Sequence, residues 1–267
     1  MNRKINRVKL YVKDTDKAHL IEKLVTNKLL NNNFIIDDNT YDMAISIGGD
    51  GTFIKMLHSN NFNNNIYYAS VNAGSLGFLS SIESDDIEKF INNLNNDLFS
   101  TRELDLLKTR VYKNNIFNDY LSINEITIRK SDFSSLRCDV KIDNNLFENY
   151  VGDGLVVSTS TGSTGYNYAL GGAIIDSSVK AYLLSSIAPI SNKVYKTLSN
   201  SLVLSNNKKI SIVPSDNTNL CILNDGKIIK INDISKIECT MENSIKCIVL
   251  DEYSNIINIK SKIIDNM

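Results

Sequence analysis

The sequence predicts an open α/β sheet domain followed by an antiparallel β-sandwich domain. In residues 1–100, segments with the period of a strand alternate with segments with the period of a helix, which is typical of a sheet whose strands are joined by helices. In residues 101–250, strand-length apolar runs follow one another with turn residues between them. No linker rich in proline or glycine separates the two parts, so the change of period near residue 100 marks the expected boundary. The tail, about residues 251–267, is free to return to the first domain.

The first domain is expected to alternate strand and helix throughout. Val8, Leu10 and Val12 alternate as in a half-buried strand, and residues 16–30 carry apolar side chains at helical spacing. The apolar run at 43–47 ends in glycines, which indicates a buried parallel strand. The expected order is a strand at 8–12, a helix at 16–30, a strand at 43–47, a helix at 53–58, a strand at 66–71 and a helix at 85–94.

The second domain is expected to consist of short antiparallel strands. Asp225-Gly226 lies between two alternating runs, and such a pair is a strong signal for a type I′ hairpin turn. One helix, at about 177–187, is expected to interrupt the strands. The expected strands lie at 108–112, 119–128, 136–142, 146–150, 201–204, 209–214, 220–223 and 227–231.

Composition bounds the class of protein. The chain has 267 residues, of which 42% are hydrophobic and 22% charged, so it can bury a substantial core. Its 29 basic and 30 acidic residues give a net charge of −1, whereas a nucleic acid or a membrane surface requires a basic excess on one face. We therefore expect neither partner. No apolar run is long enough to span a membrane or to form a signal peptide, so we expect a cytoplasmic protein.

Cysteine and histidine usage argues against a metal site of the zinc type. The cysteines form no CxxC pair, and the only histidines are His19 and His58. We therefore expect no protein-bound metal and four reduced thiols. The cysteines are Cys138, Cys221, Cys239 and Cys247.

A glycine-rich turn, Gly48-Gly49-Asp50-Gly51-Thr52, follows the strand at 43–47. Its glycines let backbone N–H groups converge, and the next helix adds its positive end, so the turn suits a phosphate group. It is neither a P-loop nor the dinucleotide fingerprint, because the spacing fits neither. Since a carboxylate repels phosphate, Asp50 indicates a loop that places a phosphoryl group next to a hydroxyl, where Asp50 accepts the proton or helps to hold Mg²⁺. The alternative is that Asp50 only caps the helix.

A second motif spans residues 152–166 and reads GDGLVVSTSTGSTGY. An apolar strand runs into six serine and threonine residues, two glycines and Tyr166. Hydroxyl and backbone N–H groups bind a neutral sugar or an amide without adding charge, and a tyrosine ring offers a base a flat face. The motif therefore favours a nucleoside pocket; the alternative is an ordinary polar loop.

These motifs resemble, in order and spacing, those of the bacterial NAD kinase family. The resemblance rests on the glycine turn, on Asn124-Glu125 and on the segment 152–166. The segments 72–79 and 171–173 are similar to two further glycine turns of the family, and the likeness covers roughly residues 43–230. The glycine turn alone is shared with lipid kinases, whereas the Asn-Glu pair and the hydroxyl segment are more particular to NAD kinases.

The resemblance implies a role for each matching residue. Asp50 would activate the adenosine ribose 2′-hydroxyl of NAD, while Asn124 and Glu125 would lie against ribose hydroxyls and Asp153 against the nicotinamide end. Neighbouring strand residues point to opposite faces, so Asn124 and Glu125 can both face a ligand only at a strand end or bulge. The phosphate-binding residues would be Gly48, Gly49, Gly51 and Thr52. The remaining NAD-binding residues would be Gly74, Leu76, Phe78, Thr161, Thr164, Gly165, Tyr166 and Ala169.

The sequence departs from the family at three positions of the motifs. Ser160 and Ala173 stand where proline is usual, and Gly165 stands where alanine is usual. These changes loosen the backbone without removing a functional group, so we expect weaker affinity and unchanged chemistry. Asp225-Gly226 stands where some relatives place an acid or a histidine, and the hairpin turn explains it equally well.

The resemblance implies a kinase that uses ATP, or polyphosphate, with NAD as the acceptor. Mg²⁺ is expected to arrive with the donor and to be held mainly by its phosphates, because the sequence offers no carboxylate cage. For this activity, Asp50 and the segment 152–166 must meet in one cleft. The resemblance also implies a homodimer or homotetramer, in which Ile187 and Ala188 would reach a neighbour's site. Two alternatives stay open: a lipid or sphingoid kinase that shares the glycine turn, and a sensor that binds NAD(P) without turnover.

Overall fold

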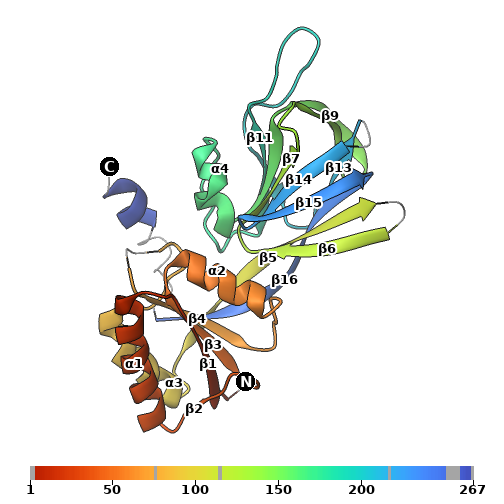
Figure 1. The fold of residues 1–267 in the computed structure, drawn as a ribbon. Coiled ribbons are helices and arrows are strands. Elements are labelled where there is room, and N and C mark those ends of the chain that lie inside the picture. Colours follow the sequence, from red (N-terminus) through yellow and green to blue (C-terminus); the bar gives the residue numbers. More distant parts are fainter. Residues whose placement is uncertain (1–3, 75–76, 114–115, 216–217, 251–258, 266–267) are drawn as a thin grey trace. The chain divides into compact units, whose positions relative to one another are not determined.

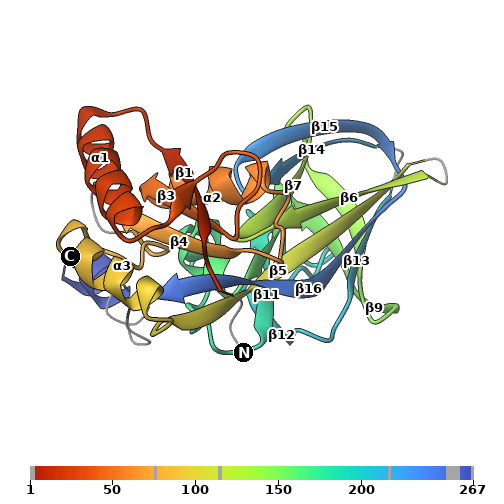
Figure 2. The same cartoon turned by 90° about the horizontal axis from the view of Figure 1, so that it is seen from below.

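The computed structural model of the chain describes residues 4–74, 77–113, 116–215, 218–250 and 259–265. Leu76 and most of the tail at 251–267 lie outside these ranges. The chain forms two compact units, residues 1–104 with 244–267 and residues 105–243. The boundaries fall within two long paired strands, β5 (Ser100–Lys113) and β16 (Lys236–Val249), as Figure 2 shows.

The first unit is an open parallel sheet with helices on both faces. Its strands run in the order β2 (Ile35–Ile36), β1 (Arg7–Val12), β3 (Met43–Gly48), β4 (Tyr67–Asn72) and the end of β16. Helices α1 (Asp16–Asn31) and α3 (Ile87–Asn95) lie side by side on one face, and α2 (Asp50–Ser59) covers the other (Figure 1). A short 3₁₀ turn at Ser84–Asp86 precedes α3. The α/β prediction is confirmed, including the buried strand at 43–47.

Residue spacing explains why these segments form helices. α1 buries Ala18, Ile21, Val25 and Leu29, which recur every three or four residues on one face. The Thr15 hydroxyl caps its start by accepting a hydrogen bond from the Ala18 N–H at 3.4 Å. α2 begins at Asp50, three residues earlier than expected, because the glycine turn itself supplies the first helical residues.

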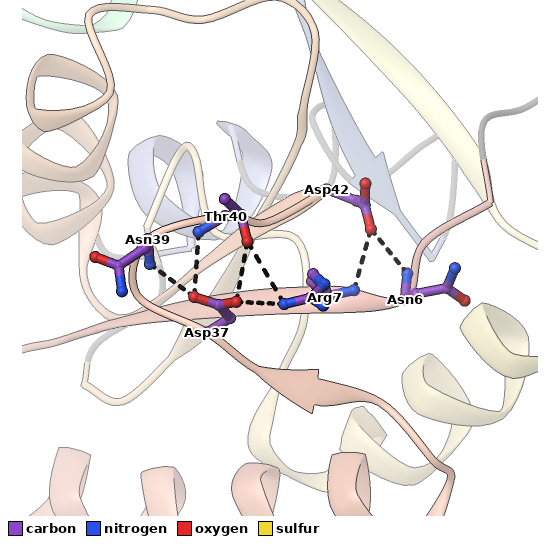
Figure 3. A network of polar contacts seen from close by, with 6 residues as sticks. All are labelled: Asn6, Arg7, Asp37, Asn39, Thr40 and Asp42. Atoms are coloured by element: carbon purple, nitrogen blue, oxygen red, sulfur yellow. Dashed lines mark hydrogen bonds and ion pairs between the residues drawn. The ribbon is translucent and has the colours of Figure 1, made fainter.

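A polar network holds the edge of this sheet (Figure 3). The Asp42 carboxylate accepts the backbone N–H groups of Asn6 and Arg7, both at 3.1 Å. The Asp37 carboxylate accepts the N–H groups of Asn39 and Thr40, and these bonds, with the Thr40 hydroxyl and the Arg7 guanidinium, hold its pKa well below its usual range. The network fixes the loop between β2 and β3, and so the register of both strands on β1.

The second unit is a sandwich of two antiparallel sheets. One sheet has β16, β13, β8 and β9 in that order, with β5 paired to β16 and to β6. The other has β12, β11, β10, β7, β14 and β15 in that order. The bounds are β6 (Ile116–Ser122), β7 (Glu125–Lys130), β8 (Leu136–Ile142), β9 (Asn145–Gly152), β10 (Gly154–Thr159), β11 (Ala181–Ile187), β12 (Leu202–Ser205), β13 (Ile210–Pro214), β14 (Thr218–Asn224) and β15 (Lys227–Ile234). One core cluster contains apolar residues of both sheets, which confirms the predicted β-sandwich.

Two predicted elements are wrong. The helix expected at 177–187 is strand β11, which pairs with both β10 and β12. Its side chains are buried on both faces, and such a continuous apolar run cannot be told from a buried helix by its period. The single strand expected at 119–128 is interrupted between β6 and β7, where the Asp225 carboxylate accepts the N–H groups of Ile123 and Asn124. Strand β16 was not expected at all.

Candidate functional site

The glycine turn connects β3 to α2 through an unusually close approach. A Cβ added to Gly48 would lie 2.3 Å from the Thr52 Oγ1 and 2.8 Å from its Cβ, so only glycine allows the helix to begin this near the strand. Gly49 and Gly51, in contrast, have nothing within 4 Å of an added Cβ. The outer side of the turn is therefore open, as a turn that receives a ligand must be.

Asp50 is held by the second glycine loop. Its carboxylate accepts the backbone N–H of Phe78 at 2.8 Å and that of Leu79 at 3.1 Å. The residue at the N-cap of α2 is Gly49, so the alternative that Asp50 only caps its helix is wrong. A carboxylate offers about four lone-pair sites, so two bonds to N–H groups fix its position and leave it able to accept a further proton or hydrogen bond.

Gly77 makes this arrangement possible, and the sequence analysis did not identify it as a site residue. A Cβ at Gly77 would lie 2.0 Å from the Asp50 Oδ1. Of the predicted residues in this loop, Gly74 is exposed with open space beside it and Phe78 is half-buried. Leu76 is outside the described residues.

The loops gather at the carboxyl edge of the parallel sheet. β1 has β2 on one side and β3 on the other, so the strand order reverses between β1 and β3, where ligands of open α/β sheets bind. The glycine turn follows β3 at this point. The exposed Lys13, which follows β1, has its Cβ 3.1 Å from the position of a Gly48 Cβ. Sequence reasoning missed this cation, whose only signal is its place directly after the first strand.

In the second unit, Asn124 and Glu125 lie at the start of β7, as their neighbouring positions required. The Asp225 carboxylate accepts the N–H groups of Ile123, Asn124 and Glu125 at 2.9, 2.8 and 3.2 Å. Asp225 and Gly226 both have positive φ, 46° and 81°, which confirms the predicted type I′ turn. Asp225 thus forms the turn and also anchors the Asn-Glu pair, a second function that its turn position concealed.

Glu125 is half-buried at the start of β7. Burial, and secondly the Asp225 carboxylate, raise the pKa of Glu125 to about 7, while a hydrogen bond from the Tyr166 N–H opposes this shift. Ser158 stands directly opposite Glu125 in the strand register. Glu125 Oε2 and Ser158 Oγ are both buried without a hydrogen-bond partner in the described part of the chain. Since buried polar atoms are normally paired, the two mark a place for a ligand hydroxyl or a water molecule.

The Thr159 and Ser163 hydroxyls of the segment 152–166 bond within the chain. Thr159 Oγ1 donates to the Ile123 carbonyl at 2.6 Å and accepts the Gly162 N–H at 2.9 Å. Ser163 Oγ donates to the Ser160 carbonyl at 2.6 Å. Two of these bonds lie at the short helix η2 (Thr161–Thr164), which is followed by α4 (Tyr166–Ala169). The predicted residues that stay at least partly accessible are Asp153, Thr161, Thr164, Gly165, Tyr166 and Ala169.

The buried Asn167 side chain holds this segment through hydrogen bonds to its backbone, and the sequence did not indicate this role. Asn167 is fully buried, and its amide nitrogen donates to the carbonyls of Ser163 and Ala173, both at 3.0 Å. Its amide oxygen accepts from the Ser185 hydroxyl at 2.8 Å. A Cβ at Gly172 would lie 2.0 Å from that oxygen, so the turn after α4 depends on glycine there.

The described residues offer no preformed metal cage, since no three His, Cys, Asp or Glu side chains among them are placed to hold an ion. All four cysteines are free. Burial raises the pKa of Cys239 and Cys247 to about 12 and also raises that of Cys138, so these thiols stay protonated. Within the described ranges, no helix combines the length and the apolar character that crossing a membrane demands.

Comparison with known proteins defines the class. The model of the ATP-NAD kinase N-terminal domain matches residues 9–99, and that of the ATP-NAD kinase C-terminal domain matches residues 123–249. The chain is 34% identical to the NAD kinase of Streptococcus gordonii over 83% of this chain and 81% of that protein. It is 35% identical to the NAD kinase of Latilactobacillus sakei over 78% and 79% of the two chains.

A solved structure shares the fold. The crystal structure of yeast NADH kinase complexed with NADH matches with a TM-score of 0.86, at 19% identity, over 99% of this chain and 89% of that chain. The fold and the paired motifs define a two-domain kinase. The chain belongs to the ATP-NAD kinase family. The lipid kinase and the non-catalytic sensor receive no support.

Proposed function

We propose that this chain transfers the terminal phosphoryl group of ATP to the 2′-hydroxyl of the adenosine ribose of NAD, giving NADP and ADP. The observation that carries the proposal is Asp50, whose carboxylate is held by two backbone N–H groups inside a glycine turn. The turn lies at the strand-order reversal of a sheet whose family phosphorylates NAD.

Asp50 is the catalytic residue in this proposal. A ribose hydroxyl is too weak an acid to ionise at neutral pH, and phosphoryl transfer is loose, so the proton leaves late. The 2′-oxygen bonds to the γ-phosphorus, the bond from that phosphorus to the bridging oxygen breaks, and Asp50 accepts the hydroxyl proton. Positioning and charge stabilisation supply most of the rate. The open side of the turn at Gly49 and Gly51, together with Lys13, suits the donor phosphates.

The second unit supplies the NAD site. Glu125, with an unpaired buried oxygen opposite Ser158, suits a ribose hydroxyl. Tyr166, which is partly exposed, suits stacking against the adenine base. Asp153, exposed on its turn, is assigned to the nicotinamide end. Asn124, Gly74, Phe78, Thr161, Thr164, Gly165 and Ala169 complete the proposed set.

A divalent cation, Mg²⁺ in our proposal, supplies charge neutralisation of the donor phosphates. The possible metal ligands favour an ion that arrives with ATP. The described residues form no cluster of carboxylates that could hold an ion, and Asp50 is the one carboxylate of the glycine turn. Polyphosphate suits the same turn, because the turn would bind phosphate groups through backbone N–H groups and would not contact the adenine base of a donor.

The proposal further requires Asp50 and the segment 152–166 to act on one NAD molecule. We assign the active form to a homodimer or homotetramer and its place to the cytoplasm, where the four free thiols suit a reducing compartment.

The test is direct. Purified protein is mixed with NAD, Mg²⁺ and either ATP or polyphosphate, and NADP is detected with an NADP-specific dehydrogenase. Phosphorus NMR of the product distinguishes a 2′-phosphate from other sites. Phosphorylation of a sphingoid base or diacylglycerol with no NADP would replace the proposal by the lipid alternative, and NAD binding with no product under any donor would favour the sensor.

A further inference from the structure

One buried hydroxyl connects three backbone groups around the turn that carries Asp153. Tyr150, in β9, is 1% exposed. Its hydroxyl accepts the Gly154 N–H at 3.1 Å and lies within hydrogen-bond distance of the carbonyls of Gly154 and of Ile187, the latter at 3.0 Å. A hydroxyl has one proton, so it donates to one of the two carbonyls at a time. Burial raises the pKa of Tyr150, so the proton stays in place.

These bonds join the β9–β10 turn to the end of β11. The Asp153 N–H also donates to the Ile187 carbonyl, at 2.9 Å, so the Tyr150 hydroxyl and the Asp153 backbone share one acceptor. A Cβ added to Gly152 would lie 2.3 Å from the Tyr150 hydroxyl and 3.0 Å from the Ala188 carbonyl. The turn, the hydroxyl and the end of β11 are therefore in close contact, with no space between them.

The backbone beside this contact is strained. Ala188 has a φ of 44°, in the left-handed region that alanine avoids. It also precedes Pro189, and a proline disfavours helical conformations at the residue before it. Such strain persists only when the surroundings enforce it. Because Tyr150 bonds to Ile187, the residue before Ala188, its hydroxyl is one of the groups that enforce it.

We infer that Tyr150 is a positioning residue, whose hydroxyl fixes the backbone of the turn at 152–154 and through it the carboxylate of Asp153. This inference rests on the proposed function, which assigns Asp153 to the nicotinamide end of NAD. Tyr150 itself touches no substrate, because its hydroxyl is enclosed by backbone. The consequence is specific: loss of the hydroxyl weakens NAD binding and leaves the phosphoryl donor site in the other unit unaffected.

The test is Tyr150→Phe, which removes one oxygen and keeps the ring. The matched control is Tyr182→Phe. Tyr182 is also fully buried in the same core cluster, and its hydroxyl donates to the Lys208 carbonyl at 2.8 Å. Tyr150→Phe loses the bond from the Gly154 N–H and the bond to a carbonyl, whereas Tyr182→Phe loses the bond to the Lys208 carbonyl, so both should lose thermal stability and Tyr150→Phe should lose more. Tyr150→Phe should raise the KM for NAD about tenfold, with kcat and the KM for ATP within about twofold, whereas Tyr182→Phe should change none of the three.

Asp153→Asn, alone and combined with Tyr150→Phe, separates the two claims. If Tyr150 acts through Asp153, the double variant binds NAD no more weakly than Asp153→Asn alone. Equal effects of Tyr150→Phe and Tyr182→Phe on the KM for NAD, or additive effects in the double variant, would overturn the inference. If Asp153→Asn leaves the KM for NAD unchanged, the assigned role of Asp153 fails and the inference fails with it. If Asp153→Asn raises the KM for NAD and Tyr150→Phe does not, the role of Asp153 stands and the inference about Tyr150 is overturned. The dissociation constant of NAD, measured by calorimetry, gives the same comparison without turnover.

Discussion

Replacing Gly77 by alanine should slow phosphoryl transfer by misplacing Asp50. The added Cβ would lie 2.0 Å from the Asp50 Oδ1, 2.8 Å from its Cγ and 2.7 Å from the Ser80 Oγ, whereas real Cβ atoms stay at least 3.0 Å from such neighbours. The carboxylate or the loop must therefore move by about 1 Å. A shift of that size at a reacting group costs about 100-fold in rate, or about 2.7 kcal/mol of activation free energy.

The assay is initial-rate NADP formation at saturating NAD and ATP, with calorimetric NAD binding alongside. We expect kcat to fall about 100-fold, while the dissociation constant of NAD stays within about threefold, because most of the proposed NAD-binding residues belong to the other unit. Asp50→Asn is the control background, because a change that acts through Asp50 costs little more once the carboxylate is gone. A kcat near that of the wild type, or a full 100-fold further loss in Asp50→Asn, would refute the reasoning.

Two further predictions concern the Asn-Glu pair. The pKa of Glu125, raised from 4.5 to about 7, means that the folded state holds the proton more tightly, so stability falls as the pH rises from about 4.5 to about 7. The Glu125→Gln side chain cannot ionise, so its free energy of unfolding should not show this fall. Measured by urea unfolding, the difference between variant and wild type should change in favour of the variant by up to about 3 kcal/mol between pH 4.5 and pH 7. Parallel pH profiles of the two proteins would contradict this. Asp225→Ala removes the acceptor of three backbone N–H groups and should lower the free energy of unfolding by about 2–4 kcal/mol. It should also lower the pKa of Glu125, measurable by carboxyl NMR, and an unshifted titration would count against the Asp225 contribution.

The first unit follows from local patterns, and this explains why it was predictable. Residues 16–31 carry apolar side chains at helical spacing, of which Ala18, Ile21, Val25 and Leu29 form the buried face, while Leu20, Leu24 and Leu30 are exposed. β3 is an apolar run ended by glycines. β11 could not be predicted in the same way. One face of β11, with Tyr182 and Leu184, lies in the core between the two sheets, and the other, with Ala181 and Leu183, packs with Ile175. Both faces are therefore apolar, and such a run has no period that distinguishes a strand from a helix.

The residues of the candidate site likewise fall into those that a local pattern marks and those that it does not. The glycine turn was identifiable because a carboxylate among glycines is unusual after a buried strand, whereas the Asn-Glu pair was identified only through the resemblance to NAD kinases. Gly77, Asn167 and Tyr150 act on other residues through contacts between segments, so no local pattern marks them. The hydroxyl segment was over-interpreted, because the Thr159 and Ser163 hydroxyls bond to their own backbone neighbourhood.

The central claim is that the Asp50 carboxylate promotes transfer to the NAD 2′-hydroxyl, and single-turnover NADP formation by Asp50→Asn tests it most directly. The variant keeps the shape of the side chain, and NAD binding, measured first, confirms an intact acceptor site. Relative to the wild type, we expect Asp50→Asn to show the same dissociation constant for NAD and a rate of phosphoryl transfer lowered at least about 100-fold. Transfer at the rate of the wild type would contradict it.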